Sequence, residues 1–464
     1  MSGRLSRRAL TLSMTLLTLC SIVEKADENI LPAVLIHMRK SYVECGVSSS
    51  VDIGLSNLGT ITFVRAVFQA GISPWAGHWG DRYDRTVVVM IGCVVWGIAI
   101  TCIGFSTSLW QATWLAALNG IGIALSIPTI SSLVADMTGV KHRGRVFGIM
   151  GFMSNIGGMI GGAVATYVAT KYECTGWRAV FISVGMLSVF IGVLEQAIAV
   201  DPHINLKEKT KGRHQEEIGG QLKQMIHSLF ILARVPSCNL LVAQGIVGTM
   251  PWVSMSFFTV WFQTLGFSGE KAAQLVAIFS CSCAFGVVFG GFLGDNLSKR
   301  TSTGRILVGQ TSILLGIGFS TMLCCHGIRY TPSHPDDGFS SYAMMLALLG
   351  LSSSWCGTNN TVIFSEIVPQ HMLTRVFAFD RTFEGAIGAL GAPLVGIVAS
   401  RWFGFSFQGE EPGKALSKAL LFCLLCPWTL CLIFYSCLHR TYAEDKRRAR
   451  EQMPQSSMDV LVAW

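Results

Sequence analysis

The sequence predicts an all-α, polytopic membrane protein whose twelve transmembrane helices form two halves of six. Three observations support this prediction: a very apolar composition, twelve long apolar segments, and motifs of the first half that recur in the second. Only 13% of the 464 residues are charged, whereas 51% are hydrophobic. A soluble protein of this size carries about twice that charged fraction, so we expect lipid to be the solvent of this chain.

The predicted spans follow from length and apolarity. A helix needs about 20 mostly apolar residues to cross the hydrocarbon core of a bilayer. By this rule the spans are residues 9–37, 53–78, 87–106, 110–135, 146–170, 178–200, 238–264, 271–295, 304–327, 341–368, 375–401 and 415–437. The first span follows a basic start, as in a secretory signal, but no small-residue cleavage site comes after it. We therefore interpret it as a retained span.

One long polar interval sets the domain organisation. Residues 201–237 divide the spans six and six and are interpreted as a cytoplasmic linker. The predicted parts are an N-terminal bundle over residues 1–200, this linker, a C-terminal bundle over 238–438 and a cytoplasmic tail over 439–464. The tail is short and basic, and we expect it to be disordered.

The distribution of charge predicts the orientation. With both termini in the cytoplasm, most of the 35 Lys and Arg residues lie on the cytoplasmic side, as the positive-inside rule requires. These charges occupy short segments between apolar runs, so the net charge of +8 does not indicate a nucleic-acid partner. Most of the 15 cysteines lie in apolar segments and are expected to pack as small hydrophobes. Their spacing is not typical of metal ligands, and no metal or cofactor is expected.

Motifs at the cytoplasmic ends of the spans repeat between the halves. Gly77-x-x-x-Asp81 follows the second predicted span, and Gly291-x-x-x-Asp295 follows the eighth, 214 residues later. In each half, an acidic residue also ends the fourth span and an Arg-Val-Phe segment opens the fifth. These residues are Asp136 and Arg145 in the first half, and Glu366 and Arg375 in the second. Six-plus-six repeats are typical of transporters that bind their solute between the halves.

The segment Gly77-His-Trp-Gly-Asp81-Arg82-Tyr-Asp-Arg85 resembles the major facilitator signature, G-x-x-x-D-R-x-x-R, between the second and third spans. With the span count and the repeat, this resemblance covers essentially the whole chain. It implies the major facilitator (MFS) fold and a monomeric carrier rather than an enzyme. It also implies a cytoplasmic gate in which Asp81 meets the eleventh span and Arg82 pairs with Asp136. The other residues of this gate motif would be Gly77, Arg85, Arg145, Gly291, Asp295, Glu366 and Arg375.

Three stretches are similar to the spinster-like branch of that superfamily. They are residues 24–34, the run from Gly120 to Asp136, and residues 379–385. The resemblance implies proton-coupled transport, by some members of lysophospholipids or sphingolipid-type molecules.

Charged residues lie in the middle of the first predicted span. Glu24, Asp27 and Glu28 share one helical face, with Lys25 beside them. Charge within a bilayer costs at least ~2.5 kcal/mol per residue, so these groups are candidates for function. Crowded carboxyl groups are typical of sites that exchange protons. The alternative is structural: Lys25 pairs with Glu28 and the rest of the cluster lies near an aqueous surface.

Two more charged sites lie within the predicted spans. Arg65, in the second span, must find an acid, and the first-span cluster is the obvious candidate. It either locks helices together or holds an anionic group of the solute with its planar guanidinium. In the eleventh span, Asp380, Arg381 and Glu384 share one stripe. We expect Asp380 to form a helix-end salt bridge and the deeper Glu384 to have a role in transport.

Polar residues of the central spans are candidates for lining a solute cavity. Each could instead join two helices by a hydrogen bond worth about 0.6 kcal/mol. The candidates are Asn119, Ser126, Thr129, Asn155, Gln244, Trp252, Trp355, Asn359 and Asn360.

The sequence therefore predicts a secondary transporter that moves a small solute by alternating access, with the proton as the expected coupling ion. Its partners would be the solute and membrane lipids. The sequence leaves open whether the substrate is lipid-like or a small organic anion. A sensor or scaffold with a carrier fold, and an uncoupled facilitator, are the alternatives. No G-x-x-x-x-G-K-[ST] segment occurs, which argues against ATP-driven pumping.

Overall fold

A computed structural model describes residues 7–43, 54–138, 143–201, 235–329, 338–368, 376, 380 and 382–451. The described part of the chain is helical and contains no strand. The first half comprises α1 (Arg7–Val43), α2 (Leu55–Arg82), α3 (Arg85–Phe105), α4 (Leu109–Met137), α5 (Arg143–Lys171) and α6 (Gly176–Ile198). The second half comprises α9 (Pro236–Ser254), η2 (Met255–Phe257), α10 (Phe258–Thr264), α11 (Gly269–Ser298), α12 (Gly304–Arg329), α13 (Phe339–Ser353), α14 (Trp355–Ile367), a helical stretch over 382–388, α16 (Gly391–Phe403) and α17 (Pro412–Glu451).

The predicted all-α membrane fold is confirmed. Within the described residues, nine helical segments are long and apolar enough to cross a membrane. Three of the predicted spans fall outside that group. α1 carries its charged cluster mid-helix, α2 carries Arg65, and the tenth span is divided into α13 and α14. In each of these three spans, the charged residues or the helix break lie where polar groups gather inside the protein.

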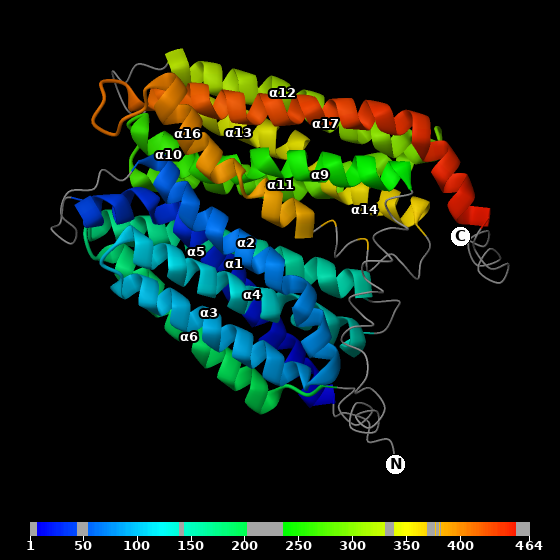
Figure 1. Ribbon diagram of the computed structural model, residues 1–464, viewed down its shortest axis with the longest axis horizontal. Helices are drawn as coiled ribbons and strands as arrows, with labels where there is room; N and C mark the ends of the chain where they lie inside the picture. Colours follow the sequence, from blue (N-terminus) through cyan, green and yellow to red (C-terminus); the bar gives the residue numbers. More distant parts are fainter. Residues whose placement is uncertain are drawn as a thin grey trace.

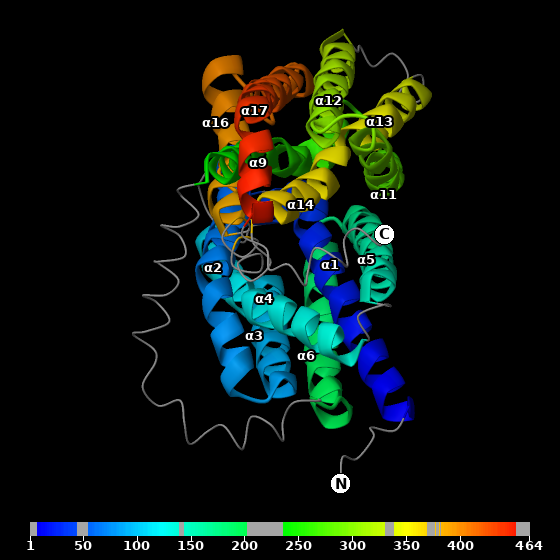
Figure 2. The same ribbon diagram turned by 90° about the vertical axis from the view of Figure 1, so that its right-hand side faces the viewer.

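The helices form two bundles. In Figures 1 and 2, α1 to α6 lie together in the lower part of the molecule and α9 to α17 in the upper part. The start of α1 and the end of α17 lie at the same end of the molecule (Figure 1). This end will be called the terminal end.

Glycines bring helices of the first bundle into backbone contact. A Cβ on Gly97 of α3 would lie 2.7 Å from the carbonyl oxygen of Gly185 in α6, and one on Gly185 would lie 2.5 Å from the carbonyl oxygen of Gly97. On α5, Gly158 and Gly161 face Lys25 and Ala26 of α1 in the same close manner. Small residues at such crossings are how helices associate in lipid, where apolar side chains gain nothing from leaving the solvent.

The two bundles meet at the end opposite the termini. A Cβ on Gly59 near the start of α2 would lie 2.7 Å from the backbone of Ala392 in α16. The guanidinium of Arg39, near the end of α1, lies 4.1 Å from the centre of the Phe407 ring. The halves are therefore closed against each other at this end.

Two spans of the second bundle are interrupted. Pro251 lies near the end of α9, and the 3₁₀ turn η2 follows it before α10 begins. Proline removes a helical hydrogen bond and favours such a break. α13 ends at Ser353 and α14 begins at Trp355. Both interruptions lie beside the cavity described below, because Trp252 and Ser353 line it.

The C-terminal region differs from the prediction. α17 does not end near residue 437 but continues to Glu451, so the expectation of a disordered tail from residue 439 was wrong for residues 439–451. Tyr442 is buried there, and the Asp445 carboxylate accepts a hydrogen bond of 2.9 Å from the backbone N–H of Ser237 at the start of α9. These contacts with the second bundle hold the extra turns in place.

The close α3–α6 crossing predicts opposite effects for two glycine substitutions. Gly185→Ala places a methyl group against the backbone of Gly97 and should destabilise the protein by about 1–3 kcal/mol, the usual cost of overpacking. Gly318→Ala on α12 meets nothing within 4 Å and should be neutral or stabilising, because Ala is a better helix former than Gly by about 1 kcal/mol. Thermal unfolding in detergent measures both. Equal unfolding temperatures for the two variants would contradict the packing described here.

Candidate functional site

The first part of the candidate site is a buried network of polar and charged side chains that joins α1, α2 and α4. Arg65 Nη2 lies 3.1 Å from Asp27 Oδ2, as expected from the sequence. Asn119 Nδ2 donates a second hydrogen bond to the same oxygen, at 3.2 Å. All three side chains are buried. A buried carboxylate is tolerated when a cation and further hydrogen bonds replace its water, and this network supplies both.

The other charges of α1 are more open. Lys25 pairs with Glu28, whose side chain is 51% exposed. Glu24 is partly buried and forms no hydrogen bond or ion pair with another described residue. Both glutamates lie within electrostatic range of Arg65. The cluster therefore combines one carboxylate held by two partners with two carboxylates that are held less firmly.

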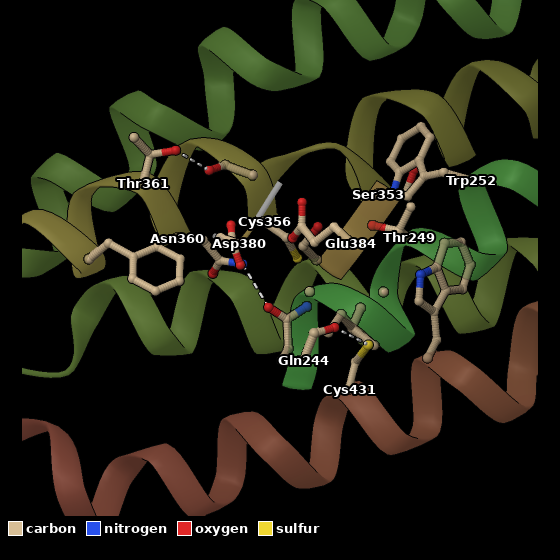
Figure 3. Close-up of a pocket in the computed structure, with 17 residues that line it drawn as sticks. Gln244, Thr249, Trp252, Ser353, Cys356, Asn360, Thr361, Asp380, Glu384 and Cys431 are labelled. Carbon is tan, nitrogen blue, oxygen red and sulfur yellow. Dashed lines mark hydrogen bonds between the residues drawn. The ribbon is translucent and has the colours of Figure 1, made fainter. Parts of the chain in front are cut away.

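The second bundle contains a cavity of about 320 Å³ between α9, α12, α13, α14, Asp380, the 382–388 stretch and α17 (Figure 3). Of the residues predicted to line a cavity or carry charge, Gln244, Trp252, Asn360 and Glu384 lie on its wall, together with Asp380. Lining residues that the prediction did not include are Gly245, Gly248, Thr249, Ser312, Ile313, Ser353, Cys356, Gly357, Thr361, Phe364, Trp428 and Cys431.

A hydrogen-bond chain fixes one wall of this cavity. Asn360 Nδ2 donates to Gln244 Oε1 at 2.7 Å (Figure 3). The hydroxyl of Tyr435 on α17 in turn donates to Asn360 Oδ1. The chain links α9, α14 and α17, so it orients both amides and leaves the Gln244 amide nitrogen as a donor beside Gly248.

Two acidic side chains form another part of the wall. Asp380 is buried and Glu384 is partly buried. The Glu384 carboxylate lies directly against Gly245 of α9, in space that any larger residue at position 245 would fill. Asp380 and Glu384 lie one helical turn apart, and both face the cavity (Figure 3). The helix-end salt bridge expected for Asp380 stays a prediction, because the residues next to it lie outside the described part of the chain.

The remaining polar candidates do not line this cavity. Ser126 and Thr129 donate to the backbone of their own helix, at 3.1 and 2.7 Å. Asn155 does the same at 2.9 Å, on an exposed face of α5. Trp355 packs against Gly290, and Asn359 Nδ2 donates to the carbonyl of Gly290 at 3.1 Å, which ties α14 to α11.

Arg85 of the gate motif has a partner that the sequence did not indicate. Its Nη2 lies 3.2 Å from Oδ1 of Asp201, just after α6, and its Nη1 donates to Ser132 Oγ at 2.7 Å. Arg85 and Asp201 are both buried. Asp84 accepts a hydrogen bond of 2.9 Å from the backbone N–H of Thr86, so the end of the motif also caps the start of α3.

In the second half, Asp295 and Glu366 converge on one arginine. Arg305 Nη2 lies 2.6 Å from Asp295 Oδ1, and Arg305 Nε lies 3.9 Å from Glu366 Oε1. Glu366 also pairs with Lys446 at 2.9 Å and accepts a hydrogen bond from Tyr442. This cluster joins α11, α12, α14 and α17 at the terminal end. The sequence prediction included the two acids but missed Arg305, Tyr442 and Lys446.

Several predicted gate and site residues are not characterised at the level of side chains. Gly77, Asp81, Arg82, Asp136 and Arg145 lie in described helices, but their side-chain environments lie outside the described part. Arg375 and Arg381 lie outside the described residues altogether. Gly291 packs on α14, since its Cβ would lie 3.4 Å from Thr358 Cγ2.

Comparison with known proteins gives the family. The model of the Major Facilitator Superfamily matches residues 17–393. The chain belongs to this superfamily. Membership makes it a protein of a membrane-carrier family rather than an enzyme, and agrees with the bundles and the repeated motifs.

The carrier's fold and sequence are similar to those of proteins with different roles. A bacterial homolog to the human lysosomal transporter Spinster, in an inward-facing and occupied conformation, superposes with a TM-score of 0.74 at 16% identity, covering 95% of this chain and 99% of that one. The membrane sensor protein UhpC of Salmonella typhimurium is 25% identical over 80% of this chain and 78% of its own length. Macrolide efflux protein A of Streptococcus pyogenes is 24% identical over 77% of this chain and 83% of its own.

The Asp27–Arg65 network predicts a reciprocal effect on stability. Asp27→Asn or Arg65→Gln alone leaves a buried charge without its partner, which typically costs about 3–5 kcal/mol. The double variant Asp27→Asn/Arg65→Gln removes both charges and should recover most of this loss. Thermal unfolding of the four proteins in detergent gives the coupling. Single variants as stable as the parent would show that the Asp27–Arg65 pair does not contribute to the stability of the folded protein.

Proposed function

We propose that this protein is a secondary transporter that moves a small polar solute by alternating access and couples the movement to protons. The observation that carries the proposal is the charged network in the middle of α1, where Asp27 pairs with Arg65 and two further carboxylates lie close by. Such groups within a membrane span are costly and mark ion or substrate pathways. The fold supplies the two halves that must rock against each other.

Within this network, Glu24 and Glu28 are the proposed proton-binding groups. Asp27 is held by Arg65 and Asn119, so protonating it would break a buried ion pair. Glu24 has no such partner among the described residues, and the Lys25–Glu28 pair is partly exposed. These two carboxylates can therefore gain and lose a proton with less rearrangement, while Asp27 keeps Arg65 in place.

The contacts between the halves support alternating access. They close the end opposite the termini through α2 and α16 and through Arg39 and Phe407. With both termini in the cytoplasm, closure of this end corresponds to an inward-facing arrangement, the conformation in which the Spinster homolog was solved. Gly59 of α2 and Gly396 of α16 bring the two backbones into direct contact at this end, and such a contact between small residues can form and part as the halves rock.

The size of the cavity favours a small solute over a long-chain lipid. A volume of about 320 Å³ is near the lower end of the range for ligand pockets, about 300–1,000 Å³. The lining combines apolar side chains with amides, hydroxyls and carboxylates, and the polar groups suit a solute that can form hydrogen bonds. We therefore propose the small-solute class in place of the lipid-like one.

A sensor is the second candidate, because UhpC is named a membrane sensor protein and is similar over most of both chains. A sensor with this fold would bind a solute without moving it. Measurement of flux separates the two functions.

Proton coupling predicts the behaviour of two variants in liposomes. The purified protein should accumulate its solute when a pH gradient is imposed, in a screen of lysolipids, small organic anions, amines and neutral solutes. Glu24→Gln or Glu28→Gln should reduce gradient-driven accumulation by about tenfold or more while solute exchange continues, because the proton site is removed and the solute site is not.

The matched control is Glu173→Gln, which removes an exposed carboxylate that pairs with Lys40 at 3.0 Å. It should accumulate solute like the parent. Accumulation that is undiminished in both α1 variants would overturn the proton role. Solute binding with no flux in the parent protein would identify a sensor.

The proposed orientation has support from a disulfide. Cys174, in the turn between α5 and α6, is disulfide-bonded, and this turn lies at the end opposite the termini. Disulfides persist in oxidising compartments rather than in the cytosol. An epitope at the C-terminus should therefore be reached by antibody from the cytosol, whereas one inserted after Gly409 should be reached only from the other side. The reverse pattern in selectively permeabilised cells would show the opposite orientation.

A further inference from the structure

We propose that the outer face of α17 binds an anionic phospholipid, with the phosphate at Arg440 and an acyl chain along the two turns before it. A shallow groove of about 290 Å³ lies on this face, and the described residues that line it are Leu432, Ile433, Ser436, Cys437 and Arg440. The inference does not depend on the transport function, because a sensor with the same fold would present the same surface to the membrane.

The groove lies on a face that lipid covers in a membrane protein. α12 and α17 lie on the side of the second bundle away from the first (Figures 1 and 2). Leu430 and Ile433 of α17 are 47% and 52% exposed. Cys437 and Arg440 are exposed further along the helix. These four positions recur every three or four residues, so they share one stripe of the helix, and acyl chains are the solvent for its apolar part.

The end of this stripe carries the charge that selects the headgroup. Residues 419–439 contain no Lys, Arg, Asp or Glu, and Arg440 is the residue that follows them. Arg440 therefore lies where the span leaves the hydrocarbon, at the terminal end of the molecule. Seven residues of helix place it about 10 Å beyond Ile433 along the axis, so one lipid can reach both.

Arg440 forms no ion pair with another residue in the described part of the chain. The next cations of α17 do have acidic partners: Arg447 lies 3.7 Å from Glu451. Glu444, one turn after Arg440, pairs with Arg448 instead. The guanidinium of Arg440 is exposed, and its planar arrangement of N–H donors matches the oxygens of a phosphate. A lipid phosphate would supply the negative charge that these acids do not.

Packing of α17 fixes Arg440 relative to the apolar stripe. Gln310 of α12 donates from Nε2 to Ser436 Oγ at 3.1 Å, and its Oε1 lies 3.0 Å from His439 Nε2. The helix then continues to Glu451. The headgroup contact and the acyl-chain contact therefore keep a constant spacing, which a disordered tail after the last span would not provide.

Cys437 provides a reporter within the groove, because its thiol is free and exposed. The full chain in detergent is titrated with phosphatidylglycerol, phosphatidylcholine or glycerol 3-phosphate. The rate at which N-ethylmaleimide alkylates Cys437 is measured by peptide mass spectrometry. We expect phosphatidylglycerol to protect the thiol with an affinity about fivefold higher than phosphatidylcholine, the usual contribution of one basic residue near anionic lipid. Glycerol 3-phosphate, which has no acyl chain, should give no protection.

Variants link the preference to Arg440, each compared with the same variant without lipid. Arg440→Gln should reduce the affinity for phosphatidylglycerol to that for phosphatidylcholine, whereas Arg440→Lys should keep most of the difference. Ile433→Ala should weaken both lipids equally, because it removes apolar contact area and no charge. Arg300→Gln removes an exposed cation between α11 and α12. It is the matched control and should keep the full preference.

Three outcomes would overturn the inference. These are equal affinity for the two phospholipids, no protection of Cys437 by either, and a preference for phosphatidylglycerol that persists in Arg440→Gln. Protection by glycerol 3-phosphate equal to that by phosphatidylglycerol would show a site for free phosphate and would contradict the assignment to a lipid.

Discussion

The rest of the structure depends on the constraint that charge inside a bilayer must be satisfied within the protein. The pair between Asp27 and Arg65 meets this constraint by joining α1 to α2, and Asn119 extends it to α4. Three helices of the first bundle therefore have a fixed relation in the middle of the membrane. Arg85 with Asp201, and Arg305 with its acids, meet the same constraint near the terminal end of each half.

Sequence predicted the fold well because lipid leaves few alternatives. Backbone polar groups must form their hydrogen bonds within a span, so long apolar segments become helices. The order of the helices along the chain could therefore be predicted from the order of the apolar segments. The unpredicted partners have specific causes. Asp201 lies at the edge of the predicted linker, and Lys446 and Tyr442 lie in the predicted tail. They were missed because the density of charge in a sequence does not distinguish a helix end that packs against the protein from a solvated segment. Arg305 was missed because its partners come from two other helices.

The candidate site was harder to predict, because the sequence of a span does not show which of its polar residues are buried or which of them line a cavity. Asn359 and Asn360 are neighbours in sequence, yet the first ties α14 to α11 and the second lines the cavity. Helical rotation of 100° per residue separates their directions. Glu195 of α6 is a further case. It is fully buried, and neither carboxylate oxygen has a hydrogen-bond partner among the described residues, and the sequence pattern did not indicate it.

The two candidate sites lie in different bundles but on adjoining elements. Glu384 lines the cavity, and the next residue, Gly385, faces α2, since its Cβ would lie 3.7 Å from Ala70. Ala70 lies little more than one turn beyond Arg65 on the same helix. A shift of the 382–388 stretch on solute binding would thus press on the helix that carries the partner of Asp27. In the proposed transport cycle, rocking of the halves would change this contact and both charged sites together, which would link solute movement to proton binding.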